Sequence, residues 1–199
     1  MQDITADEAL KRLVDGNARF LRGEARFPTL KKEVLAELAR AQHPYATILG
    51  CSDSRVPPEL LFDTGFGELF VIRVAGNTIG TEAAGSMQYA GTHLHTPLFV
   101  VLGHEGCGAV HAALATKFEG AQHRSRIAAV VETILPALEE IDRTLSHEAQ
   151  LKEAVRANVR WTMRQILESP EGVARLAEGK MKLVGAVCDI QTGEVTFLP

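Results

Sequence analysis

The sequence predicts an α/β fold with a mainly parallel central sheet, because short apolar segments alternate with longer amphipathic ones. Four segments are predicted to be buried strands, since each is a continuous apolar run of strand length: 45–50, 69–74, 98–103 and 182–188. A fifth strand is expected at 195–198, after a turn at 191–194, and so short a connection makes it antiparallel to the strand before it. We therefore expect about four parallel strands plus one antiparallel edge strand, flanked by helices.

Helical segments separate the first four strands, as crossover connections between parallel strands require. They are predicted at 58–62, at 81–94, at 108–117 and within a longer region at 126–177. In that longer region apolar residues recur at helical spacing, which indicates a packed face. The chain shows no repeat and no change of composition that would mark a boundary, so a single domain covering 1–199 is expected.

Two amphipathic helices are predicted before the first strand, and they form an N-terminal helical arm over 1–42. The first begins after Thr5, which can cap it, and places Asp7 and Glu8 in the first turn, where the helix dipole favours acids. The second is predicted at 30–41. Arms of this kind often pack on a neighbouring subunit, so we expect this arm to contact a partner.

Composition and charge restrict the class of partner. The net charge of −4 and the lack of a basic cluster argue against nucleic acid and against a membrane surface. No apolar run reaches the roughly 18 residues that a transmembrane helix needs. The first residues lack the features of a signal peptide, so the cytoplasm is the expected location, with the periplasm as the alternative if a leader has been removed. A small molecule is the expected partner.

Two loops carry soft metal ligands directly after predicted strands. Cys51 follows the first strand, and His104 and Cys107 follow the third. In parallel sheets the carboxyl ends of neighbouring strands meet at one edge, where ligands bind. Thiolate and imidazole groups are the ligands that zinc prefers, and three protein ligands with one open position are typical of a catalytic site. The pattern therefore predicts a zinc site that lowers the pKa of bound water toward neutrality and generates hydroxide.

Asp53 and Arg55 follow Cys51 at a spacing that allows them to pair. Such a pair would hold the carboxylate ionised and away from the metal, as an acceptor for the bound water. If Arg55 released it, Asp53 could take the fourth coordination position and close the site. Cys188, the third cysteine, lies inside an apolar strand and is expected to be core.

The segments CSDSRVPPE at 51–59 and GHEGCGAV at 103–110, with FVIRVAGN at 70–77 between them, resemble the β-class carbonic anhydrases. The resemblance runs from about Asp7 to the C-terminus. It implies reversible hydration of carbon dioxide to bicarbonate and a proton by zinc-bound hydroxide, with one Zn²⁺ per subunit. It also implies homodimers, often paired into homotetramers, that are built through exchanged N-terminal helices.

The same resemblance implies a substrate pocket. Gln42 matches a residue that donates a hydrogen bond to substrate, Phe70 and Tyr89 match pocket-lining aromatic residues, and the backbone N–H of Gly108 matches a donor near the metal. Tyr89 is expected to come from the partner subunit.

One subgroup of the family has a regulatory bicarbonate site with a tryptophan three residues before the first cysteine ligand. Ile48 stands at that position here, although Gly50 and Arg73 match the rest of the site. The resemblance therefore favours the subgroup that is constitutively open. Arg73 is expected to be structural, at a strand end, where it can satisfy loop carbonyls or an acid.

Two other functions fit the same residues. Carbonyl sulfide and carbon disulfide are linear isosteres of carbon dioxide, so a hydrolase for these sulfur compounds could use the same site. A non-catalytic zinc-binding regulatory protein is the alternative from a different class. It would require Asp53 to stay locked on the metal, with Arg55 unpaired.

Overall fold

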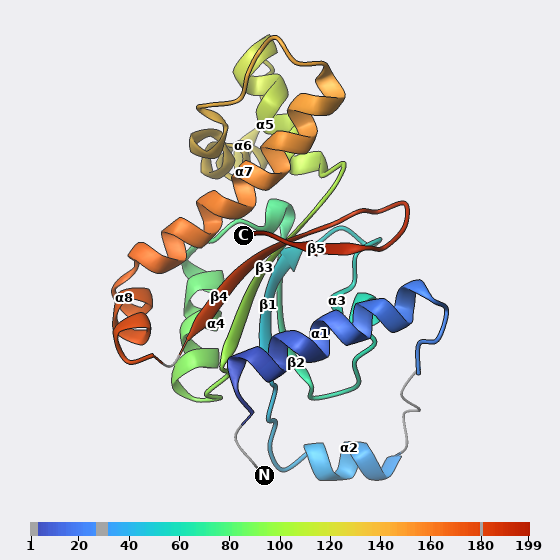
Figure 1. Ribbon diagram of the computed structural model, residues 1–199. Helices are drawn as coiled ribbons and strands as arrows, with labels where there is room; N and C mark the ends of the chain where they lie inside the picture. The colour runs from blue at the N-terminus through green and yellow to red at the C-terminus, as the bar shows by residue number, and fades with distance from the viewer. Residues whose placement is uncertain (1–3, 27–31, 180) are drawn as a thin grey trace.

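A five-stranded sheet forms the centre of the computed structural model, which describes residues 4–26, 32–179 and 181–199 (Figure 1). The strands are β1 (Ala46–Cys51), β2 (Leu69–Val74), β3 (Leu98–His104), β4 (Lys182–Cys188) and β5 (Val195–Phe197). Their order is β2-β1-β3-β4-β5, with the first four parallel and β5 antiparallel to β4. This arrangement confirms the predicted fold class.

Helices connect the strands and cover the sheet. They are α1 (Ala6–Leu21), α2 (Lys32–Leu38), α3 (Pro58–Leu61), α4 (Thr81–Thr92), α5 (Gly108–Glu119), α6 (Ser125–Ile134), α7 (His147–Glu168) and α8 (Pro170–Ala177), with short 3₁₀ turns η1 (Ala75–Asn77) and η2 (Leu135–Leu138). In Figure 1, α5, α6 and the first part of α7 form a lobe beyond the carboxyl ends of the strands. No helix among the described residues is long and apolar enough to cross a membrane.

The long helical region predicted at 126–177 divides into several elements. Pro136 lies in the 3₁₀ turn η2, which ends α6, because proline cannot donate the backbone hydrogen bond that would continue a regular helix. Ser169 ends α7 and caps α8, its hydroxyl accepting from the N–H of Gly172, and Pro170 begins the new helix. The apolar periodicity therefore indicated helix correctly, and the prolines mark where α6 and α7 stop.

The first helix begins as predicted. The Thr5 hydroxyl accepts from the N–H of Glu8 at 3.2 Å, and the Glu8 carboxylate accepts from the N–H of Thr5 at 2.8 Å. Within this chain α1 lies on the sheet, with Ala9 and Leu13 fully buried. Contact between the arm and a partner subunit stays a prediction, and residues 30 and 31 of the predicted second helix lie outside the described residues.

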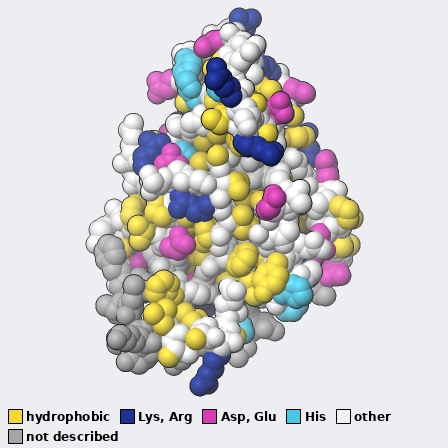
Figure 2. Space-filling view, turned by 180° about the vertical axis from the view of Figure 1, so that it is seen from behind, with side chains coloured by type: hydrophobic (Ala, Val, Ile, Leu, Met, Phe, Trp, Pro, Cys, Tyr) yellow, Lys and Arg dark blue, Asp and Glu magenta, His cyan; other side chains and the backbone are white. Residues whose placement is uncertain are grey.

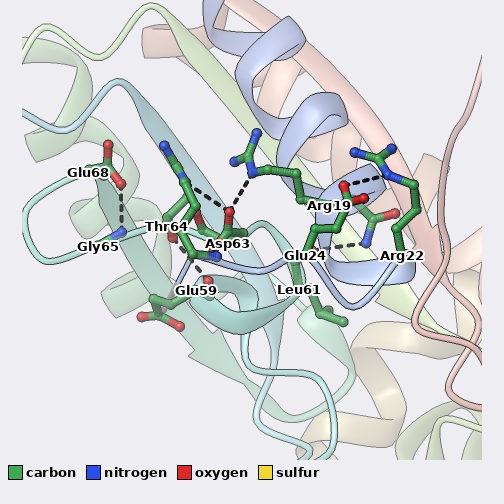
Figure 3. A network of polar contacts seen from close by, with 11 residues as sticks. Arg19, Arg22, Glu24, Glu59, Leu61, Asp63, Thr64, Gly65 and Glu68 are labelled. Carbon is green, nitrogen blue, oxygen red and sulfur yellow. Dashed lines mark hydrogen bonds and ion pairs between the residues drawn. The ribbon is translucent and has the colours of Figure 1, made fainter. Parts of the chain in front are cut away.

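An ionic contact fastens the end of α1 to the turn after α3 (Figure 3). The Asp63 carboxylate is buried and accepts from Nε of Arg19 at 2.6 Å and from Nε of Arg26 at 3.0 Å. The N–H of Arg26 also donates to it at 2.8 Å. Burying a charged carboxylate is costly, and the charge-assisted hydrogen bonds from several donors offset this cost.

The two faces of the sheet have separate cores, because successive strand residues point to opposite sides. Ile48, Val100 and Cys188 face α1, whereas Cys51 and Val101 face the side covered by α4, α5 and α7. Cys188 is fully buried, which confirms that it is a core residue. Since it lies on the opposite face from Cys51, it cannot join the same ligand set.

Candidate metal centre

Three ligand side chains converge at the carboxyl ends of two neighbouring strands. Cys51 is the last residue of β1, His104 is the last residue of β3, and Cys107 immediately precedes α5. Their candidate ligand atoms all lie within 4.8 Å of one another. Cys51 is 6% exposed, His104 0% and Cys107 1%, so the cluster is closed to bulk water on most sides.

The loop between His104 and Cys107 is shaped by its glycine and by β4. Gly106 has φ of 65°, a left-handed conformation that glycine adopts without strain and that turns the chain back within two residues. The N–H of Glu105 donates to the carbonyl of Cys188 at 2.8 Å, which fixes the loop to the end of β4.

The histidine ring is oriented for a metal. Nδ1 of His104 lies 2.9 Å from the carbonyl oxygen of Glu105, which it reaches as a donor in the tautomer that leaves Nε2 free. Nε2 is buried and has no hydrogen-bond partner among the described residues. A buried nitrogen without a partner is costly unless something binds it. Two thiolates and this imidazole nitrogen are a donor set that fits Zn²⁺.

The two cysteines share a proton between them. A hydrogen bond from Cys107 lowers the pKa of Cys51, although burial opposes the shift, and the hydrogen bond to Cys51 raises the pKa of Cys107. The N–H groups of Val110 and Ala109, at the start of α5, partly counteract the rise at Cys107. The pair therefore favours ionisation at Cys51 over Cys107, and a cation that binds both sulfur atoms would displace the proton of Cys107.

His104 belongs to the same electrostatic cluster. Burial on its own would lower the pKa of the imidazole, but the neighbouring Cys51 sulfur, the carbonyl of Glu105 and the charge of Asp53 raise it overall. The imidazole, the thiolate and the carboxylate therefore stabilise positive charge at this point, which is the condition for binding a divalent cation.

The predicted ion pair between Asp53 and Arg55 is present. Nε and Nη2 of Arg55 donate to the two carboxylate oxygens at 2.9 and 2.7 Å, and the N–H of Arg55 donates to one of them at 3.0 Å. These hydrogen bonds hold the pKa of Asp53 well below its usual range, although partial burial opposes the shift. Asp53 Oδ2 lies 3.8 Å from Nε2 of His104, so an ionised carboxylate stands at the edge of the ligand cluster.

Arg73 supports the same loop from β2. Its Nε donates to the carbonyl of Cys51 at 2.9 Å, and its Nη2 donates to the carbonyl of Asp53. This confirms the expectation that Arg73 satisfies loop carbonyls. Gly108 begins α5 beside Cys107, and a Cβ added there would meet nothing within 4 Å, so open space lies next to its backbone.

Phe70 and Tyr89, two of the predicted pocket residues, lie together, but at the other end of the sheet from the candidate ligands of their own chain. The rings of Phe70 and Tyr89 are 6.1 Å apart. Phe70 pairs with Thr47 in the strand register, four residues before Cys51, so about 13 Å of strand separates the two levels. Gln42 is exposed on the segment that leads into β1, also at the amino end.

Sequence reasoning missed a set of polar residues behind the cluster. Asn77, Asn158 and Thr162 are each about 1% exposed, and none of them was singled out. The available signal was that Asn158 and Thr162 are polar residues in the otherwise apolar buried face of a predicted helix. Buried polar side chains of this kind are rare without a hydrogen-bonding task.

A parallel α/β sheet with a buried Cys-His-Cys cluster at its carboxyl edge defines a class of metal-dependent enzyme. Comparison with known proteins makes the assignment specific. The family profile described as carbonic anhydrase matches residues 46–195. The carbonic anhydrase of Mycolicibacterium smegmatis is 39% identical over 193 residues, with 94% of this chain and 90% of that protein covered. Carbonic anhydrase 2 of Mycobacterium tuberculosis is 37% identical over 190 residues, with 95% and 91% covered.

Solved structures agree. The β-carbonic anhydrase of Coccomyxa, determined in complex with acetazolamide, superposes with a TM-score of 0.76 at 26% identity, over 95% of this chain and 86% of that one. The chain belongs to the β-carbonic anhydrase family, and its activity is the reversible hydration of carbon dioxide.

Proposed function

We propose that this chain hydrates carbon dioxide at one zinc ion held by Cys51, His104 and Cys107, with Asp53 and Arg55 as the catalytic pair beside it. The observation that carries the proposal is the buried cluster, in which two sulfur atoms and an imidazole nitrogen converge within 4.8 Å, the nitrogen having no hydrogen-bond partner in the described part of the chain. When bound, zinc would supply a hydroxide nucleophile near neutral pH by lowering the pKa of a coordinated water.

Asp53 would accept and pass on the proton that each hydration releases. Its carboxylate is 20% exposed, so it contacts solvent as well as the cluster. The bidentate contact with Arg55 keeps it ionised and turned toward the guanidinium. For Asp53 to close the site by binding the metal, Arg55 would have to release it. The intact pair therefore supports an open, catalytic site and speaks against the non-catalytic regulator.

The substrate pocket would be completed by a second copy of the chain, so that the functional unit is a homodimer. Phe70 and Tyr89 lie about 13 Å along the sheet from the ligands of their own chain, and Tyr89 is 46% exposed. In a dimer with two-fold symmetry, Gln42, Phe70 and Tyr89 of one copy can face the metal cluster of the other. Gly108, whose N–H adjoins the cluster, would be the pocket donor from the ligand-bearing copy.

The exposed apolar surface at that end of the molecule supports such a dimer. Val34 and Leu35 of α2 and Phe66, just before β2, are between 40% and 49% exposed. Hydrophobic side chains are visible over the lower half of the molecule in Figure 2. Exposed apolar groups at this density are typical of an interface. The two Sordaria macrospora enzymes that share this fold at 22% identity are tetrameric, and pairing of dimers is the corresponding finer proposal here.

The cytoplasm is the proposed location. All three cysteines are free, and two of them must stay reduced to bind metal, which a reducing compartment ensures.

Stopped-flow hydration of carbon dioxide by the zinc-loaded protein, scanned from pH 6.5 to 9, tests the activity. Cys107→Ser should lose both zinc and turnover, because it removes a ligand. Asp53→Asn should keep zinc and lose most of its turnover, because the amide cannot accept the proton. Normal turnover in Asp53→Asn would refute the role given to the carboxylate.

Mixing two inactive variants tests the shared pocket. Asp53→Asn and Tyr89→Ala each disable a different half of the proposed site, so a mixed dimer contains one site with both defects and one with none. Random exchange of subunits should therefore restore about one quarter of the sites. If Tyr89 served the cluster of its own chain, no mixture would regain activity.

A further inference from the structure

A short turn behind the metal cluster donates a hydrogen bond to one of its sulfur atoms. The N–H of Gly76, in η1, lies 3.4 Å from Sγ of Cys51, and both groups are buried. A backbone N–H that points at a thiolate withdraws electron density from sulfur and fixes its position. The direction of this N–H therefore affects both the strength and the geometry of Cys51 as a ligand.

Helix α7 holds that turn through two side chains. Nδ2 of Asn158 donates to the carbonyl of Gly76 at 2.8 Å, and Oγ1 of Thr162 donates to the carbonyl of Asn77 at 3.3 Å. The two side chains are four residues apart, so they project from the same face of the helix. The bonds hold the two peptide groups that follow the donating N–H, and the orientation of Gly76 depends on them.

Packing from the other sides leaves the turn little room. Gly76 has φ of 69°, and a Cβ added to it would lie 2.9 Å from Cδ1 of Ile134 and 3.0 Å from Cβ of Ala109. Apolar contacts from α6 and α5 thus restrict how far the turn can move, but they do not select a rotation for its peptide groups. That selection comes from the polar contacts of α7.

The cost of these buried amides indicates that they have a task. Nδ2 of Asn77 and Oδ1 of Asn158 are buried without a hydrogen-bond partner among the described residues. Leaving such a group unpaired is destabilising, because its hydrogen bonds to water are lost and not replaced. An apolar side chain of similar size would avoid this cost if position 158 served packing alone.

We propose that Asn158, assisted by Thr162, is a positioning residue of the metal centre: it holds the Gly76 N–H against Cys51 and so adjusts that thiolate as a metal ligand. Asn158 acts through the turn, at a separation of 82 residues in the sequence. The proposal rests on the proposed function of Cys51 as a ligand, and it adds a residue that acts from outside the ligand loops.

Cobalt(II) substitution gives a direct readout, because sulfur-to-cobalt charge-transfer absorption reports how strongly a thiolate donates. In Asn158→Leu the released turn should weaken the N–H contact, so this band should move to longer wavelength. Zinc affinity, measured by competition with a chelator, should fall about tenfold, the lower end of the range for partners of metal ligands. An unchanged band together with zinc affinity within twofold of the original would overturn the proposal.

A neighbouring substitution separates positioning from general stability. Val159→Ala, on the same helix, removes packing against Gly103 and Gly185 but leaves the contact to Gly76 intact. It should lower the melting temperature without moving the cobalt band, and a band shift equal to that of Asn158→Leu would overturn the proposal.

A second variant keeps the test decisive if Asn158→Leu does not fold. Thr162→Val removes only the longer of the two bonds, so it should move the band in the same direction by a smaller amount. An unshifted band in this variant would count against the proposal. A charge-transfer band missing from the unaltered protein would instead refute cysteine ligation itself.

Discussion

Replacing Gly16 with alanine tests how closely α1 rests on the rest of the chain. A Cβ at this position would lie 1.9 Å from the carbonyl oxygen of Phe62 and 2.8 Å from its carbonyl carbon, whereas an ordinary contact begins at 3.4 Å. Both atoms belong to the backbone, so no side-chain rotation can relieve the overlap. The helix would have to move away by about 1.5 Å.

That movement would also break the contacts of the next residue. Asn17 is 4% exposed and donates to the carbonyls of Leu61 and Gly193 at 3.0 and 2.9 Å, and it accepts from the N–H of Val195 at 3.0 Å. Overpacking costs about 1–3 kcal/mol, and loss of the buried hydrogen bonds adds about 1–3 kcal/mol. Alanine gains about 1 kcal/mol over glycine in helix propensity. The expected net loss in the free energy of unfolding is about 3 kcal/mol.

Urea unfolding at fixed protein concentration measures this loss, and for a chain of this size about 3 kcal/mol corresponds to roughly 6–12 °C in melting temperature. Gly85 in α4 supplies the matched control, because a Cβ there would meet nothing within 4 Å. Gly85→Ala should therefore stabilise the protein by up to about 1 kcal/mol through propensity alone. If Gly16→Ala were as stable as the unaltered protein, the close contact of α1 with the Phe62 backbone would be wrong.

Three further predictions concern the ionic contacts and the metal. Burial would raise the pKa of Asp63, but the contacts with Arg19 and Arg26 outweigh this effect, so the pKa is lowered. The ionised carboxylate therefore stabilises the folded state fully above the unfolded-state pKa of about 3.9, and this stabilisation is lost as the pH falls through the lower folded-state pKa. Asp63→Asn should thus cost about 2 kcal/mol in urea unfolding at pH 7 and much less at pH 3, and an equal difference at both would refute this. Arg73→Lys keeps the positive charge but cannot donate to the two carbonyls of Cys51 and Asp53 at once. Zinc affinity, measured by competition with a chelator, should therefore fall about tenfold, and an unchanged affinity would contradict the supporting role of Arg73. Removal of metal by dialysis against a chelator should abolish hydration of carbon dioxide and lower the melting temperature. A ligand at a hundred times its dissociation constant adds about 2.7 kcal/mol to the free energy of unfolding. A melting temperature independent of metal would argue against the metal site.

The sheet and the ligand loops were predictable because their signals are local. A strand buried on both faces is a continuous apolar run, so the positions of β1, β2, β3 and β4 follow from the sequence within a residue or two. Cys51, His104 and Cys107 stand directly after such runs, and the meeting of parallel strand ends brings them together. The ion pair of Asp53 with Arg55 depends on two neighbouring residues of one loop, which is again local information.

What could not be predicted depends on contacts between distant segments. The contact between Asn158 and Gly76 joins residues 82 apart, and no spacing rule connects a helix position with a turn so far away. The resemblance indicated that Phe70 and Tyr89 line a pocket and that Tyr89 comes from a partner, but their distance from the cluster of their own chain depends on the strand register, which the sequence does not give. Asp63 was missed for the same reason: Arg19 and Arg26 come from the N-terminal arm.

The position of β3 between β1 and β4 has a consequence for the order of biosynthesis. Cys188, whose carbonyl fixes the loop between His104 and Cys107, is translated 81 residues after Cys107. At about 5–20 residues per second, roughly 4–16 s pass in which both ligand cysteines have been made but β4 has not. Until β4 has been made, the two candidate ligand cysteines therefore depend on the reducing power of their surroundings to stay as free thiols.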